Sequence, residues 1–111
     1  MNINQIKKQA FKTAKEKGWY ETDVTFGDRI ALMHSELSEA LEEFRNCQDI
    51  EEVANYSFIQ GKPEGVPIEL ADVIIRVCEA CELYGIDLDE AVKTKLEFNK
   101  NRPYRHGGKR M

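Results

Sequence analysis

Two pairs of acidic residues, each with a spacing of three, are the residues of this chain whose types best suit chemistry. Glu36 and Glu39 form one pair, and Glu69 and Asp72 form the other. On a helix, side chains three residues apart project from one face and can share a cation. Two such pairs on facing helices supply enough hard oxygen ligands for Mg²⁺ or, as a substitute, Mn²⁺. The pattern therefore favours a divalent metal site between two helices.

A solvated helix surface is the ordinary alternative for each acidic face. The stretch 68–85 reads as an apolar helix with one narrow polar stripe, formed by Glu69, Asp72, Arg76 and Glu79. A buried helix with one wet side has the same pattern. The first pair is also ambiguous, because Glu39 and Glu42 have the same spacing, and its acidic face lies opposite the apolar stripe of its helix. Leu32 lies among these acids, which suggests that something, for example a partner subunit, covers the face, although a single exposed leucine is also ordinary.

The last predicted helix carries cations on the side that begins as an apolar stripe. In chain order, this side holds Leu88, Ala91, Val92, Lys95, Asn99 and, if the helix lasts, Arg102. Such a face suits a polyanion held by metal on one side and by Lys and Arg on the other. The alternative is a packing stripe that runs into a solvated basic terminus.

Composition is typical of a soluble helical protein of one domain. The chain has 111 residues, of which 32% are charged and 41% hydrophobic, and its net charge is −4. No window reaches the run of about 18 apolar residues that a membrane span needs, and the first residues lack the apolar centre of a signal peptide, so we expect a cytoplasmic protein without membrane contact. The charge argues against dedicated nucleic-acid binding. Three cysteines do not make a disulfide framework, and core packing explains Cys78 and Cys81 better than zinc does.

Helical periodicity and capping signals predict four main helices. They are expected at about 2–17, from a Thr25 N-cap to about 46, from Pro67 to about 85, and from Asp87 to about 101. The second helix has an apolar core stripe of Phe26, Ile30, Met33, Leu37, Leu41 and Phe44. Between the second and third helices, residues 47–65 are expected to hold a short helix and then a loop at "QGKPEG". Four helices with one longer crossover indicate an all-α bundle.

The segments "ELSEALEEF" and "ELADVIIRVCEACELYGIDLDEAVKTKLEFNKNRPYRHGGK", with "KGWY" near the N-terminus, carry a resemblance that covers most of the chain. They resemble the MazG-like branch of the all-α nucleoside triphosphate pyrophosphohydrolases. The resemblance implies a single MazG-like domain over 1–111 with a short basic tail from about 102. It implies a Mg²⁺-dependent four-helix bundle enzyme, assembled as a homodimer or dimer-based homotetramer, that hydrolyses a nucleoside triphosphate to the monophosphate and pyrophosphate.

The same resemblance assigns roles to individual residues. The metal ligands would be Glu36, Glu39, Glu69 and Asp72, and Glu39 is our choice for the base that activates water. Phosphate would be held by Lys95 and Arg102 with help from Asn99. Trp19 would stack on the nucleobase of the substrate. A partly buried aromatic residue at the end of the first helix is the ordinary alternative for Trp19. The 29 residues between Glu39 and Glu69 exceed the family's expected spacing, so the 40–68 crossover carries an insertion that would reshape the base pocket.

Two other functions stay open on the sequence. Phosphoribosyl-ATP pyrophosphohydrolase is a related reaction on a similar fold, and nothing in the residues selects or rejects that substrate. A non-catalytic helical module that binds a nucleotide or a partner through its charged faces would need no metal. A ferritin-type di-iron bundle is disfavoured, because neither histidine of the chain follows a Glu at the Glu-x-x-His spacing.

Overall fold

The computed structural model describes residues 1–103, which form four α-helices, a short 3₁₀ helix and one β-hairpin. In chain order, the elements are α1 (Ile3–Glu16), α2 (Phe26–Arg45), η1 (Ile50–Ala54), β1 (Ser57–Ile59), β2 (Lys62–Glu64), α3 (Val66–Leu83) and α4 (Leu88–Lys100). The chain is therefore mostly helical, as the sequence predicts.

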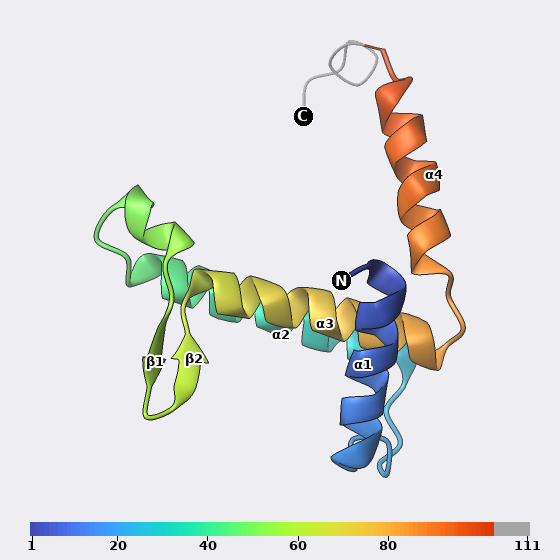
Figure 1. Ribbon diagram of the computed structural model, residues 1–111, viewed down its shortest axis with the longest axis horizontal. Helices are drawn as coiled ribbons and strands as arrows, with labels where there is room; N and C mark the ends of the chain where they lie inside the picture. Colours follow the sequence, from blue (N-terminus) through green and yellow to red (C-terminus); the bar gives the residue numbers. More distant parts are fainter. Residues whose placement is uncertain (104–111) are drawn as a thin grey trace.

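The helices are arranged around α3. Helices α2 and α3 lie side by side and run in opposite directions, and α1 crosses them near the C-terminal end of α3 (Figure 1). Helix α4 leaves the end of α3 and projects away from the α2 and α3 pair (Figure 1). One chain thus packs three helices together and leaves the fourth outside, so a single copy does not close a four-helix bundle.

Local capping chemistry explains where the helices begin. Thr25 and Asp28 form a reciprocal capping box at the start of α2, with N···O distances of 3.1 and 3.0 Å. Asp87 accepts a hydrogen bond from the Glu90 amide at 3.1 Å and caps α4. Helix α3 has no side-chain cap, but Pro67 lies in its first turn, where no amide hydrogen is needed. These predicted helix starts are confirmed.

The crossover between α2 and α3 differs from the expected loop. It holds the short helix η1, as predicted, but "QGKPEG" supplies the turn and second strand of a hairpin in which Phe58 pairs with Pro63. Gln60 and Gly61 both have positive φ, at 53° and 81°, which is the pattern of a two-residue type I′ turn. Strands of three residues carry too little alternation to be recognised in sequence, which is why the loop prediction was wrong here.

Small side chains form the contact between the helices. The buried apolar residues of the described chain are Ala14, Ala40, Val66, Cys78, Ala80 and Cys81. Cys78 and Cys81 therefore pack in the core as expected. Lys7 of α1 is buried beside the turn that follows α3, where its Nζ donates to the Ile86 carbonyl at 2.7 Å. This contact fixes α1 against the junction of α3 and α4.

The predicted core stripe of α2 is not covered by its own chain. Five of its six members, all except Met33, are 38 to 49% exposed. The side of α2 that is at least partly buried is instead formed by Arg29, Met33, Glu36, Ala40 and Glu43. The assignment of that stripe to the core of one chain is therefore wrong. The polar side of α2 is the side that packs, and its apolar side is left without a partner in a single copy.

The overall dimensions agree with this uncovered surface. The radius of gyration is 16.8 Å, whereas a compact domain of this length has about 13 Å. The accessible surface is 8715 Å², whereas a compact monomer of this size exposes about 6,300 Å². Within residues 1–103, no helix combines the length and the apolar character that crossing a bilayer requires.

Candidate metal centre

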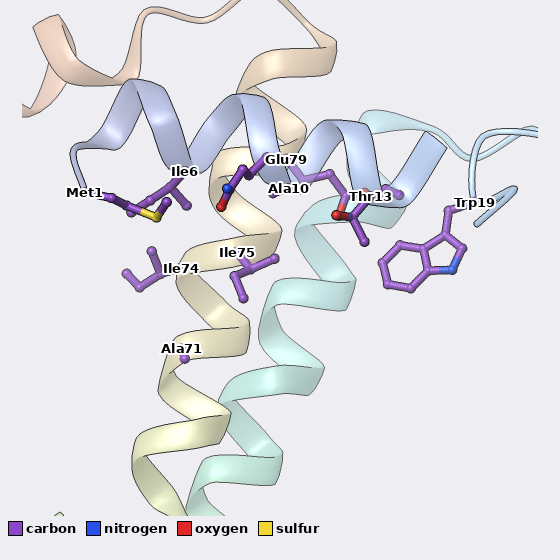
Figure 2. Close-up of a pocket in the computed structure, with 11 residues that line it drawn as sticks. Met1, Ile6, Ala10, Thr13, Trp19, Ala71, Ile74, Ile75 and Glu79 are labelled. Atoms are coloured by element: carbon purple, nitrogen blue, oxygen red, sulfur yellow. The ribbon is translucent and has the colours of Figure 1, made fainter. Parts of the chain in front are cut away.

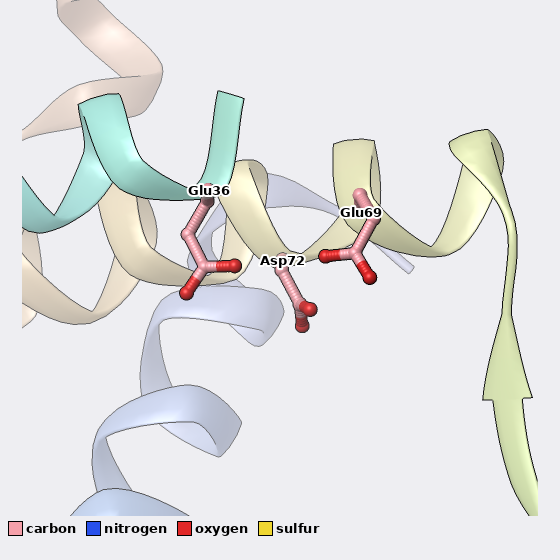
Figure 3. Close-up of side chains that lie close together, drawn as sticks. All are labelled: Glu36, Glu69 and Asp72. Atoms are coloured by element: carbon pink, nitrogen blue, oxygen red, sulfur yellow. The ribbon is translucent and has the colours of Figure 1, made fainter. Parts of the chain in front are cut away.

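Three carboxylates from two helices converge where α2 and α3 lie side by side. Glu36 comes from α2, and Glu69 and Asp72 come from α3 (Figure 3). One carboxylate oxygen from each residue lies within 4.8 Å of the others. Three negative groups this close repel one another in the absence of a cation. The arrangement therefore has the composition and the spacing of a site for a hard divalent ion.

Local structure explains why these side chains meet. Glu69 and Asp72 are three residues apart on α3, so both project from the same face. Ala40 is buried one turn after Glu36, and its small side chain lets α2 approach α3 closely. Glu69 also lies in the first turn of α3, where the amide groups of the helix N-terminus favour negative charge.

The carboxyl group of Glu69 has a raised pKa. Burial, and then the neighbouring carboxylates of Glu39, Asp72 and Glu36, together raise the pKa of its carboxyl from 4.5 to about 7. Its Oε2 is buried and has no hydrogen-bond partner. An ionised carboxylate with a buried, unpartnered oxygen is costly, and either a proton or a metal ion relieves that cost.

The fourth predicted ligand, Glu39, lies next to the cluster but is not one of the three residues whose oxygens lie within 4.8 Å of one another. Its carboxylate adjoins that of Glu69 closely enough to share a proton with it. Two ionised carboxylates offer no hydrogen-bond donor, so this neighbour satisfies Glu69 only when one of the two is protonated. Glu39 is also exposed to solvent. The structure thus places Glu39 beside the cluster, in contact with water.

Arg76, one turn after Asp72 on α3, connects the cluster to the rest of the helix interface. Its Nε donates a hydrogen bond to Oε1 of Glu36 at 3.2 Å. Its Nη1 lies 3.9 Å from Oε2 of Glu79, whose other oxygen lies 3.5 Å from Nη1 of Arg29. The sequence shows Arg76 and Glu79 in the polar stripe of α3, but it did not reveal their pairing across to α2.

Trp19 lies between this arginine and a pocket. The Arg76 guanidinium carbon is 4.6 Å from the centroid of the Trp19 ring. Trp19 also lines a mainly apolar pocket of about 530 Å³ between α1 and α3, together with Ala10, Ile75 and Glu79 (Figure 2). A pocket of this size with few polar groups suits a small, mainly apolar ligand. The predicted base-stacking residue is therefore at a pocket and one side chain away from the carboxylates.

The predicted phosphate-binding residues are not brought to the carboxylates within one chain. Lys95, Asn99 and Arg102 belong to α4 and the turn after it, which project away from α2 and α3 (Figure 1). Lys95 and Arg102 both lie over the Phe98 ring, at 4.7 and 5.5 Å from its centroid. Most of the predicted basic tail, residues 104–111, lies outside the described residues.

Comparisons of this chain with protein-family models, with curated proteins and with solved structures gave no match. The function must therefore be argued from the residues and from the geometry of the site.

Proposed function

We propose that this protein is a Mg²⁺-dependent nucleoside triphosphate pyrophosphohydrolase, which hydrolyses a ribo- or deoxyribonucleoside triphosphate to the monophosphate and pyrophosphate. The observation that carries the proposal is the convergence of Glu36, Glu69 and Asp72, with a buried Glu69 oxygen that lacks a partner. The reaction type comes from the resemblance of these acidic pairs and their flanking segments to MazG-like enzymes.

The donor set fits Mg²⁺ in both chemistry and dimensions. All of its atoms are carboxylate oxygens, which Mg²⁺ and Mn²⁺ prefer over nitrogen or sulfur. Oxygens on opposite sides of a Mg²⁺ ion are about 4.2 Å apart. The cluster oxygens, all within 4.8 Å, therefore need only small side-chain rotations. Glu39 is close enough to Glu69 to complete the set as a fourth ligand or to act beside it.

The residues of the chain then have distinct tasks in the reaction. Bound divalent ions would neutralise the triphosphate and polarise the attacking water. Glu39 is the proposed base, because it is exposed to water and its carboxylate adjoins that of Glu69 in the cluster. Trp19 supplies an aromatic face for the nucleobase of the substrate at the edge of the pocket. Lys95 and Arg102, with Asn99, would take up charge on the leaving pyrophosphate.

These tasks require a second copy of the chain, because α4 lies away from the carboxylates of its own chain. We propose a homodimer, or a tetramer built from dimers, in which the exposed apolar side of α2 is covered and a four-helix bundle is completed between copies. The uncovered stripe on α2 and the accessible surface, larger than that of a compact monomer, support this assembly.

Product analysis on a panel of triphosphates tests the proposal. We expect ³¹P NMR to show monophosphate and pyrophosphate, formed only with Mg²⁺ or Mn²⁺ and lost in a Glu69→Gln variant. Glu51→Gln removes an acidic group on η1, outside the cluster. This variant is the matched control and should retain activity. A nucleoside diphosphate and inorganic phosphate as products would contradict the assigned bond cleavage.

The same panel separates the two other functions. Including phosphoribosyl-ATP distinguishes the related pyrophosphohydrolase, which would release pyrophosphate from that substrate alone. A folded protein that binds nucleotides with no Mg²⁺ requirement and cleaves none of them would be the non-catalytic module. Either result would replace the general triphosphatase proposal.

A further inference from the structure

Arg76 is the one cation in residues 1–103 that forms an ion pair with a member of the carboxylate cluster. Its Nε donates a hydrogen bond to Glu36, and its guanidinium carbon lies over the Trp19 ring. Its side chain is 28% exposed, so water screens these contacts only in part. A single side chain therefore touches both a candidate metal ligand and the ring that borders the pocket.

The groups around Arg76 leave it one strong partner. Glu79 is buried, and its Oε1 pairs with Arg29 of α2. Its Oε2 lies 3.9 Å from Nη1 of Arg76, which is near the limit of an ion pair. The 3.2 Å hydrogen bond to Glu36 is the closer contact. Arg76 thus acts as the resident counter-charge of the cluster when no metal ion is bound.

We propose that Arg76 is a positioning residue that couples occupancy of the metal cluster to the Trp19 pocket. This inference rests on the proposed function, since it assumes that the cluster binds a divalent ion. An ion that draws the Glu36 carboxylate toward itself competes with Arg76 for that carboxylate. The guanidinium then moves relative to Trp19, and the ring is presented differently to a ligand in the pocket.

Only arginine has the geometry for both contacts. A guanidinium is planar, so its edge can hold a carboxylate while its face stacks on an aromatic ring. Lysine keeps the charge but offers a point-like ammonium without a stacking face. Because coupling between two binding sites is reciprocal, an aromatic ligand that displaces Arg76 from Trp19 must also change the affinity for the ion.

Trp19 is the only tryptophan of the chain, so its fluorescence reports on this contact. The test is a Mg²⁺ titration of the intact protein, followed in parallel by fluorescence and by calorimetry. For the native chain we expect a change in Trp19 emission with the same midpoint as the heat of binding. A calorimetric binding curve without any change in emission would overturn the coupling.

Two variants separate the charge of Arg76 from its stacking face. Arg76→Gln removes a unit charge near the ion, so Mg²⁺ affinity should rise by about tenfold, while the Trp19 response disappears. Arg76→Lys keeps the charge, so affinity should stay close to that of the native chain while the Trp19 response is still lost. Retention of the native response in either folded variant would refute the role of Arg76.

Arg45→Gln is the matched control, because Arg45 forms an exposed ion pair with Glu42 elsewhere on α2. It should leave both the Mg²⁺ affinity and the fluorescence response unchanged. The readouts need no turnover, so the coupling and the reaction can fail separately. A protein that cleaves no triphosphate but shows the Arg76-dependent response keeps the coupling and loses the hydrolase, and a protein that binds no Mg²⁺ loses both.

Discussion

Nη1 of Arg29 on α2 lies 3.5 Å from Oε1 of Glu79 on α3, and the two side chains are only 11% and 4% exposed. Tyr20 lies against the same pair, with its ring centroid 5.1 Å from the Arg29 guanidinium carbon. Burial, and then the negative charge of Glu79, raises the pKa of the Tyr20 hydroxyl above its usual range. Tyr20, Arg29 and Glu79 thus connect the loop after α1 to α2 and α3, the two helices that carry the carboxylate cluster.

Removing one partner of a buried ion pair leaves the other charge without compensation. Glu79→Ala strands Arg29 between the helices, so we expect the free energy of unfolding to fall by about 3–5 kcal/mol. Urea denaturation followed by circular dichroism measures the change. Glu42→Ala breaks an exposed pair on α2 and should leave stability nearly unchanged. Equal effects of the two substitutions would show that Glu79 is not buried in this way.

The raised pKa of Glu69 predicts how the stability of the metal-free protein depends on pH. The folded chain keeps the Glu69 proton up to about pH 7, whereas the unfolded chain releases it near 4.5. The stabilisation from this group is therefore complete below about pH 4.5 and is lost as the pH rises to about 7. Urea denaturation in EDTA across this window should show the decrease, and Glu69→Gln should remove its share of it.

A bound ion replaces that proton, so Mg²⁺ should stabilise the folded protein at neutral pH. At a free concentration one hundred times the Kd, the linked gain is about 2.7 kcal/mol. Thermal unfolding with Mg²⁺ and with EDTA measures the gain, which should be largely lost in Asp72→Asn. A gain of the same size in that variant would place the ion elsewhere.

The uncovered apolar stripe on α2 predicts that association depends on Leu41. Its side chain is about half exposed in one copy, so Leu41→Glu should leave the fold of the monomer intact. A charge at a buried interface is strongly unfavourable, and we expect sedimentation velocity to show monomers in place of dimers. Ile50→Glu, on η1 outside the stripe, should keep the native mass. A native chain that is already monomeric would contradict the assembly.

Helix boundaries could be predicted because their causes are local. The Thr25 and Asp28 capping box, Pro67 in the first turn of α3 and the Asp87 cap each depend on residues a few positions apart. The hairpin could not be predicted in the same way. Its turn is Gln60–Gly61 rather than a more familiar Asn-Gly or Asp-Gly, and its second strand contains a proline.

Three of the four predicted ligands, Glu36, Glu69 and Asp72, lie together in the structure, but the contacts around them could not be predicted. The i, i+3 spacing places Glu69 and Asp72 on one face of a helix from sequence alone. The pairing of Arg76 with Glu36 depends on the register between α2 and α3, which no local pattern specifies. The side of α2 that packs was misassigned for a related reason, since an apolar stripe indicates a surface that favours burial and does not specify what covers it.

Pyrophosphate release as a function of Mg²⁺ concentration tests the central claim most directly. The native chain, given a mixture of ribo- and deoxyribonucleoside triphosphates, should release pyrophosphate only when Mg²⁺ is present, and Glu36→Gln should abolish the release while Glu51→Gln retains it. Folded native protein that releases no pyrophosphate from any of these triphosphates at saturating Mg²⁺ would contradict the account.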